Sequence, residues 1–138
     1  MTPEAILLIG IQGSGKTTYY EQHYRATHAH ISRDVQGASE RDALRAALAA
    51  RQSFVLDNTN STRAVRAPYI RDAKAHGFRV IACYFEVPVR TAIGRNNHRQ
   101  DKKPIPVPAI LKTAKVLEPP SWDEGFDEVI VPKQAKTS

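Results

Sequence analysis

The sequence has a single cysteine, one methionine and one tryptophan among 138 residues, and it lacks a long hydrophobic run. One cysteine cannot form an internal disulfide, so we expect Cys83, in the apolar run RVIACYFEV, to be buried in a protein of a reducing compartment. The apolar run near the N-terminus is too short for a signal peptide or a membrane span. These absences argue against disulfide scaffolds and membrane-spanning proteins, and they favour a cytoplasmic protein with no membrane partner.

Acidic residues are fewer than basic ones, and the net charge of +6 is unevenly distributed. Residues 61–103 contain ten Lys/Arg against three Asp/Glu, whereas residues 118–128 are acidic. A basic middle suits a polyanionic partner such as nucleic acid, although many proteins are basic for no specific purpose. Hydrophobic content of 41% and charged content of 25% indicate a soluble, globular chain, most economically a single domain over 1–138.

Short apolar runs alternate with longer segments of helical character. The predicted strands are 5–10, 29–32, 53–57, 78–87 and 127–132. The predicted helices are 17–24, 39–51 capped by Ser39, 61–76 stopped by Gly77 and with Pro68 in its first turns or at a kink, 88 to about 99, and 109–117. The segment DKKPIPVP predicts a loop, and residues 133–138 predict a flexible tail. The alternation predicts a three-layer α/β fold with a mostly parallel five-stranded sheet and helices on both faces.

The segment GIQGSGKTT, residues 10–18, lies between a predicted strand and a predicted helix and matches G-x-x-x-x-G-K-[ST] in full. Its glycines let the backbone fold into a nest of N–H groups around phosphate oxygens, and the next helix presents its positive end. Lys16 reaches the β- and γ-phosphates, and the Thr17 hydroxyl ligates Mg²⁺. A plain glycine-rich turn is the alternative, but the Lys-Thr pair predicts binding of ATP, or another nucleoside triphosphate, with Mg²⁺. The residues predicted to bind ATP here are Gly13, Ser14, Gly15, Lys16, Thr17 and Thr18.

Two aspartates follow predicted strands and therefore lie at the sheet edge where ligands bind. Asp57 ends the run SFVLD, where P-loop proteins place an aspartate that holds magnesium, often through water. A turn or helix cap is the alternative, and Asn60 or Ser61 is a candidate cap of the next helix. Asp34, in ISRDVQG, stands where the preceding strand gives way to a loop. It is either a base that accepts the proton of an attacking hydroxyl or a solvated turn residue, and position alone does not decide.

Arg95 and Arg99 are four residues apart on one face of a predicted helix. On a mobile lid over the phosphate site, two guanidinium groups so aligned would neutralise the charge of a transferring phosphoryl group. The region 88–104 is the candidate lid, and a basic, solvated helix face is the alternative. The histidines of HYRATHAH, residues 23–30, are too irregularly spaced to predict a metal site.

The ordered set of motifs resembles the kinase domain of 5′-hydroxyl polynucleotide kinases, the phage and animal end-healing enzymes. The similar segments are GIQGSGKTT, SRDVQG, LDNTN, YIRDAKAHGFRV, RNNHR followed by IPVPAI, and EPPSWDEGFDEVIVP, which together run nearly end to end. The resemblance implies a P-loop NTPase fold of the nucleoside-kinase type. It also implies ATP-dependent phosphorylation of the 5′-OH end of DNA or RNA, as in end repair.

The resemblance also implies roles for individual residues. Asp34 would be the general base that takes the proton of the 5′-OH. Lys16 and Thr17 would hold the ATP phosphates and magnesium. Arg95 and Arg99 would be the lid arginines, with Arg99 on the transferring phosphate.

On the acceptor side the family varies. Some members grip the acceptor phosphate with an arginine three residues beyond the base, where this chain has Gly37. The animal type has its arginine seven residues beyond, where this chain has Arg41, and Arg33 would help to shape the acceptor slot. The other residues implied there are Asp57, which would support the metal or the acceptor, and Asn58 and Thr59.

Two other functions stay open from the sequence. A small-molecule kinase acting on a sugar, a nucleotide sugar or an antibiotic would share the P-loop, the aspartate after the second strand and the lid arginines. A nucleotide-binding module without transfer would keep the phosphate loop and lose the base. The basic segment and the DNTN motif favour the polynucleotide hypothesis. No segment resembles the phosphatase domain often fused to such kinases, and the sequence decides neither DNA against RNA nor the oligomeric state.

Overall fold

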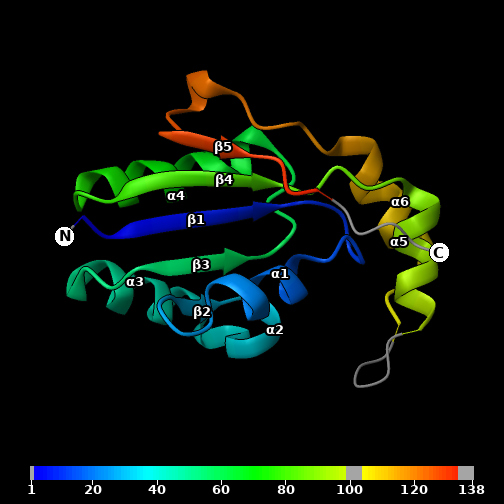
Figure 1. The fold of residues 1–138 in the computed structure, drawn as a ribbon, viewed down its shortest axis with the longest axis horizontal. Coiled ribbons are helices and arrows are strands. Elements are labelled where there is room, and N and C mark those ends of the chain that lie inside the picture. Colours follow the sequence, from blue (N-terminus) through cyan, green and yellow to red (C-terminus); the bar gives the residue numbers. More distant parts are fainter. Residues whose placement is uncertain (1, 99–103, 134–138) are drawn as a thin grey trace.

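The computed structural model of the protein describes residues 2–98 and 104–133. At its centre lies an all-parallel, five-stranded sheet in the order β2-β3-β1-β4-β5 (Figure 1). The strands are β1 (Glu4–Ile9), β2 (Ala29–Ile31), β3 (Phe54–Asp57), β4 (Arg79–Tyr84) and β5 (Glu128–Ile130). The helices are α1 (Lys16–His23), α2 (Arg33–Gln36), α3 (Glu40–Ala50), α4 (Arg63–Ala75), α5 (Val89–Asn97) and α6 (Val107–Val116), with 3-10 turns η1 (Gly37–Ser39) and η2 (Trp122–Glu124). The predicted α/β fold of the P-loop NTPase type is confirmed.

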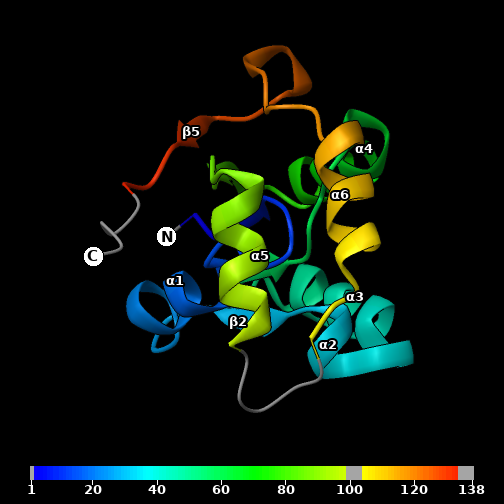
Figure 2. The same cartoon turned by 90° about the vertical axis from the view of Figure 1, so that its right-hand side faces the viewer.

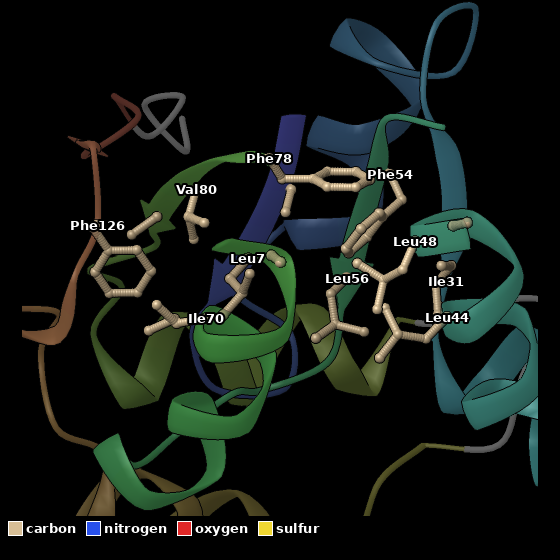
Figure 3. Close-up of a cluster of buried hydrophobic side chains, with 14 of the residues drawn as sticks. Leu7, Ile31, Leu44, Leu48, Phe54, Leu56, Ile70, Phe78, Val80 and Phe126 are labelled. Atoms are coloured by element: carbon tan, nitrogen blue, oxygen red, sulfur yellow. The ribbon is translucent and has the colours of Figure 1, made fainter. Parts of the chain in front are cut away.

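Helices cover both faces of the sheet, as predicted. On one face α3 and α4 pack over the strands, and Leu48 and Ile70 share a buried cluster with Leu7 of β1 (Figure 3). On the other face α1 contributes Tyr20 to a second cluster that includes Ile6. Successive residues of a strand point to opposite faces. The run AILLI is continuously apolar because both of its faces are buried.

All five strands end at one edge of the sheet, and α5 and α6 lie beyond that edge rather than over a face (Figure 1). Figure 2, which looks onto the edge, shows the two helices in front of the sheet. Ile11, Ala92 and Ile110 form a small buried cluster that joins both helices to the loop after β1. The Asn96 amide donates to the Ile105 carbonyl (2.7 Å) and accepts from the Ile105 N–H (2.9 Å), which ties α5 to the start of α6.

The segment after β2 differs from the prediction. The expected loop around Asp34 is the short helix α2, because the Ser32 hydroxyl caps it by accepting from the Val35 N–H at 3.1 Å. Ser39 stands at the N-cap position of α3, as predicted, but its side chain makes no capping hydrogen bond. The turn η1 leads straight into α3, so the backbone there needs no side-chain cap.

The start of α4 also differs. Thr62 caps the helix, since its hydroxyl accepts from the Val65 N–H at 3.2 Å, and neither Asn60 nor Ser61 takes that role. Pro68 lies within α4.

One glycine and one proline mark the end of one helix and the start of another. Gly77, with a φ of 80°, follows the end of α4, and the N–H groups of Gly77 and Phe78 close the helix with the paired bonds of a Schellman motif. Helix α6 begins two residues earlier than expected because a proline, Pro108, fits the first turn of a helix. The predicted end of the lid helix near Arg99 lies outside the described residues.

Cys83 is buried in β4 and is free, in agreement with the sequence. Burial raises the pKa of its thiol to about 12, so the sulfur stays protonated and unreactive at neutral pH. No helix in the described part of the chain has both the length and the apolar character needed to span a membrane.

Candidate active site

The phosphate-binding loop connects β1 to α1 and lies directly beneath α5. Gly13 and Gly15 have φ values of 78° and 97°, in the left-handed region that glycine adopts without strain. A Cβ on Gly13 would collide with the backbone carbonyl of Ala92 in α5, and one on Gly15 would lie 3.4 Å from the Arg95 guanidinium. The close approach of α5 therefore requires the first glycine, and it places Arg95 over the loop.

Lys16 is the first residue of α1, and its side chain is folded against the loop. Its ammonium donates to the carbonyl oxygens of Gly10 (3.0 Å) and Ile11 (2.8 Å) and lies 3.4 Å from the Ser14 hydroxyl. The residue is only 8% exposed. These carbonyls keep a positive charge at the loop, where the oxygens of a bound polyphosphate would take over its hydrogen bonds.

Asp57 lies at the end of β3 and joins it to α1 and β2. One oxygen of its carboxylate accepts hydrogen bonds from the Thr17 hydroxyl at 2.7 Å and from His30 Nε2 at 2.8 Å. The His30 ring stacks on Tyr20, with ring centroids 4.1 Å apart. Burial raises the pKa of Asp57, but the hydrogen bonds from His30 and Thr17 and the charge of Lys16 outweigh it and hold the pKa below its usual value. The carboxylate is therefore ionised at neutral pH.

Thr17 and Asp57 fit the magnesium ion that the sequence predicts. A hydroxyl oxygen and an ionised carboxylate oxygen lie 2.7 Å apart at the start of the helix that follows the loop. Magnesium in phosphate-transfer sites binds oxygen, commonly through one or two protein groups together with substrate phosphates and water. These two residues supply that donor set.

His30 is a candidate that sequence patterns did not reveal. No spacing rule relates it to Asp57, and the irregular histidines around it gave no reason to single it out. The pairing of β2 with β3 creates the contact, since His30 pairs with Val55 and Asp57 follows two residues later. The one available signal was that His30 lies in the short strand that leads into the segment SRD, at the ligand-binding edge.

Asn58 connects the two segments predicted to bind the acceptor. Its side-chain oxygen accepts from the Arg33 N–H at 3.1 Å, and its side-chain nitrogen donates to Glu40 at 3.1 Å. The end of β3 is thereby joined to the start of α2 and to α3. Asp34 is the second residue of α2 and is exposed on this side of the site.

Asn60 and Thr59 hold the strand ends in place. Asn60 is 2% exposed, and its side-chain nitrogen donates to the carbonyls of Leu8 (2.7 Å) and Leu56 (3.2 Å) at the ends of β1 and β3. The Thr59 carbonyl accepts from the Gly10 N–H at 3.1 Å, where the phosphate loop begins. The second half of the DNTN motif therefore fixes the geometry of the edge.

Arg66, another residue that sequence patterns did not single out, is fully buried in α4. Its guanidinium makes two parallel bonds to the Glu124 carboxylate (2.8 and 2.9 Å) and donates to the carbonyls of Asn60 and Glu118 at 2.9 Å each. The side chain thus ties α4 to the DNTN segment and to the turn before β5. A basic helix residue is usually solvated, so only the fold reveals this role.

Three further predicted residues, Thr18, Arg33 and Arg41, belong to α1, α2 and α3. Arg33 and Arg41 line a hollow of about 540 Å³ beside α2, α3 and α4. Thr18 is exposed in the first turn of α1. Arg99 lies outside the described residues. The structure brings the loop, Lys16, Thr17, Arg95 and Asp57 together, and it places Arg33, Asp34, Arg41 and Asn58 on the neighbouring side of the edge.

Known proteins place the chain in a family. A family described as an AAA domain matches residues 36–120, more than half of the chain. The chain belongs to the AAA domain family. The matched stretch begins after the phosphate loop, so the loop motif is evidence additional to it.

Solved structures of similar fold include two kinases and a protein solved with an ADP complex. A gluconokinase from Sinorhizobium meliloti 1021 aligns with a TM-score of 0.65 and 18% identity, over 94% of this chain and 81% of that one. Kti12 from Chaetomium thermophilum, solved with ADP-AlF3, aligns with a TM-score of 0.65 and 21% identity, over 93% and 88%. The APS kinase CysC from Mycobacterium tuberculosis, solved with AMPPNP and APS, aligns with a TM-score of 0.59 and 12% identity, over 97% and 91%. These likenesses show the fold, and the chain has the α/β fold of the P-loop kinase type.

Proposed function

We propose that this protein transfers the γ-phosphate of ATP to the 5′-hydroxyl end of a nucleic acid. One observation carries the proposal: an arginine-lined hollow between α3 and α4 begins at Arg33, the residue next to Asp34 in α2. A phosphate loop accounts for the nucleotide donor. An arginine-lined hollow next to a carboxylate suits an acceptor that itself carries phosphates, because guanidinium groups pair well with phosphate oxygens.

In the proposed reaction, the Asp34 carboxylate accepts the proton of the 5′-OH as that oxygen attacks the γ-phosphorus. A new P–O bond forms while the bond from the γ-phosphorus to the β,γ-bridging oxygen breaks, and ADP leaves. Lys16 and Arg95 stabilise the charge on the transferring phosphoryl group. Thr17 and Asp57 would hold Mg²⁺, which neutralises phosphate charge when bound. We also propose a cytosolic location.

Transfer of labelled γ-phosphate tests the function directly. The protein, ATP and Mg²⁺ are incubated with matched oligonucleotides that end in 5′-OH or 5′-phosphate, as DNA and as RNA. We expect label on 5′-OH strands only, and loss of that label in an Asp34→Asn variant that still binds ATP. A wild-type protein that binds ATP and labels no strand would overturn the proposal.

A small-molecule kinase is the second candidate, because a gluconokinase and an APS kinase are among the proteins with a similar fold. Competition separates the two functions. If the acceptor site takes nucleic acid, excess 5′-OH oligonucleotide should suppress phosphorylation of any small acceptor. Strong turnover of a small acceptor that oligonucleotide does not inhibit would favour the second candidate.

A further inference from the structure

The hollow between α3 and α4 has the size of a ligand site rather than of a packing defect. Its volume is about 540 Å³, and small-ligand sites commonly measure about 300–1,000 Å³. It begins at Arg33, next to Asp34, and extends along α3 to Arg45 and across to Arg71 of α4. The proposed function uses only its near end. The far end, around Arg45 and Arg71, has no role in the chemistry described above.

Positive charge at the hollow is only partly balanced. Four arginines line it, namely Arg33, Arg41, Arg45 and Arg71, against the two carboxylates of Glu40 and Asp72. Within residues 2–98 and 104–133, the first three arginines form no ion pair. Arg71 pairs with Asp72 at 3.1 Å, but both side chains are largely exposed, and such surface pairs are weak enough to be exchanged. Like charges gathered around a concave surface favour a polyanion over a neutral ligand.

Apolar side chains also line the same hollow. They include Leu44, Val65 and Tyr69, and Val65 is 47% exposed although it is a large hydrophobic residue. A surface that combines an exposed apolar group and a partly exposed aromatic group with several arginines matches how proteins hold single-stranded nucleic acid, where bases rest on side chains and phosphates on cations. A base inside a duplex is not available for such a contact.

We propose that the hollow between α3 and α4 holds one nucleotide of a single-stranded acceptor, downstream of the reacting 5′ end. Its phosphates contact Arg45 and Arg71, and its base rests on Val65 and Tyr69. The inference rests on the proposed function and adds to it a path for the strand and a preference for unpaired ends.

Steady-state kinetics with 5′-OH strands of two to about eight nucleotides test the path. The double variant R45Q/R71Q is compared with R25Q/R79Q, which removes the same charge from the end of α1 and the start of β4. For the wild-type protein we expect KM to fall as the strand becomes longer. In R45Q/R71Q this fall should be lost, so that KM for the longest strand is about fivefold higher than the wild-type value while kcat is unchanged. The slope of log KM against log salt should fall by about one. Equal KM values for the two double variants at every length would overturn the proposal.

Substrates with one abasic position test where the base binds, without altering the protein. The abasic position is moved along the strand, and we expect KM to rise about fivefold or more at one position, because one base loses its contact with Val65 and Tyr69. A blunt duplex should have a higher KM than the matched single strand. If KM is the same at every abasic position, or if the blunt duplex and the single strand have equal KM values, the proposed contact of the base with Val65 and Tyr69 is overturned.

Binding of 5′-phosphorylated strands separates this proposal from the proposed function. Fluorescence polarisation measures affinity without turnover, so it applies even if the protein labels no 5′-OH strand. Weaker binding by R45Q/R71Q than by R25Q/R79Q supports the strand path, whether or not transfer occurs. Equal binding by the two variants overturns it, while the transfer assay alone decides the proposed function.

Discussion

The two sides of the ligand-binding edge are built in opposite ways. On the donor side, Lys16, Asp57 and Asn60 are each at most 8% exposed, and each is hydrogen-bonded to backbone carbonyls or to other side chains. On the proposed acceptor side, Arg33 and Asp34 are exposed. A buried polar group that loses its partner costs stability, whereas an exposed charge is solvated with or without one. The donor side is therefore coupled to folding, and the acceptor side is free to serve binding and chemistry.

The largest effect on activity should come from a substitution of the exposed Asp34. Asp34→Asn keeps the size of the side chain but removes the base, so kcat should fall by about 10²–10⁴. The variant should unfold at the wild-type urea concentration, because the side chain is exposed. Transfer kinetics and urea unfolding measure both quantities. Unchanged kcat would remove Asp34 from the chemistry, and a large loss of stability would break the contrast between the two sides.

The buried arginine should give the largest loss of stability. Arg66→Met leaves Glu124 buried without its partner and two carbonyls without their donor, which should cost about 3–5 kcal/mol of unfolding free energy. Arg71→Met is the matched control on the same helix, since Arg71 pairs only with the neighbouring Asp72, at 3.1 Å, among the described residues, and both side chains are exposed. The control should unfold close to the wild-type urea concentration. Equal losses of unfolding free energy in both variants would contradict the assignment of Arg66 as a buried residue that holds these segments together.

His30 should affect the metal rather than the acceptor, as a positioning residue for Asp57. His30→Phe keeps a ring against Tyr20 but removes the hydrogen bond to the carboxylate. Residues that orient a metal ligand typically change metal affinity by about 10–100-fold, so half-maximal activity should need that much more Mg²⁺. His30→Gln, which restores a donor, should recover part of the loss. An unchanged Mg²⁺ requirement in both variants would leave His30 a purely structural role.

The smallest effect should come from Arg41→Gln. Removing one exposed cation from the hollow should raise KM for a 5′-OH oligonucleotide about threefold at low salt, with kcat and stability unchanged. The difference from wild type should shrink as salt rises, because screening weakens the contact that was lost. Arg25→Gln controls for net charge. A change in kcat instead of KM would move Arg41 from binding into the chemistry.

Much of the fold followed from local patterns. The phosphate loop could be recognised because a glycine nest and a Lys-Thr pair occur within nine residues directly after a strand, and Gly77 marks the end of α4 through a local hydrogen-bond pattern. The starts of the helices were harder to predict, because several neighbouring residues could cap each helix. Ser32, Ser39, Asn60, Ser61 and Thr62 are all good capping residues, and the backbone path decides which of them can reach a free N–H.

The residues of the candidate site show the same difference between local patterns and long-range contacts. Asp34, Asp57 and Lys16 could be named because each stands directly after a strand or at a fixed offset in a motif. His30 and Arg66 could not, because their partners are 27 and 58 residues away in sequence. Such contacts form only when strands β2 and β3 pair and when α4 packs against the turn before β5.

The sequence by itself determined the alternation of strands and helices, the phosphate loop, and the position of an aspartate after each of two strands, because these depend on interactions within a few residues. Only the tertiary structure decided that His30 holds Asp57, that Asn60 and Arg66 tie the strand ends together, and that arginines from three helices surround one hollow. The physical reason is that burial and long-range hydrogen bonds select which polar residues become structural, and no local pattern records that selection.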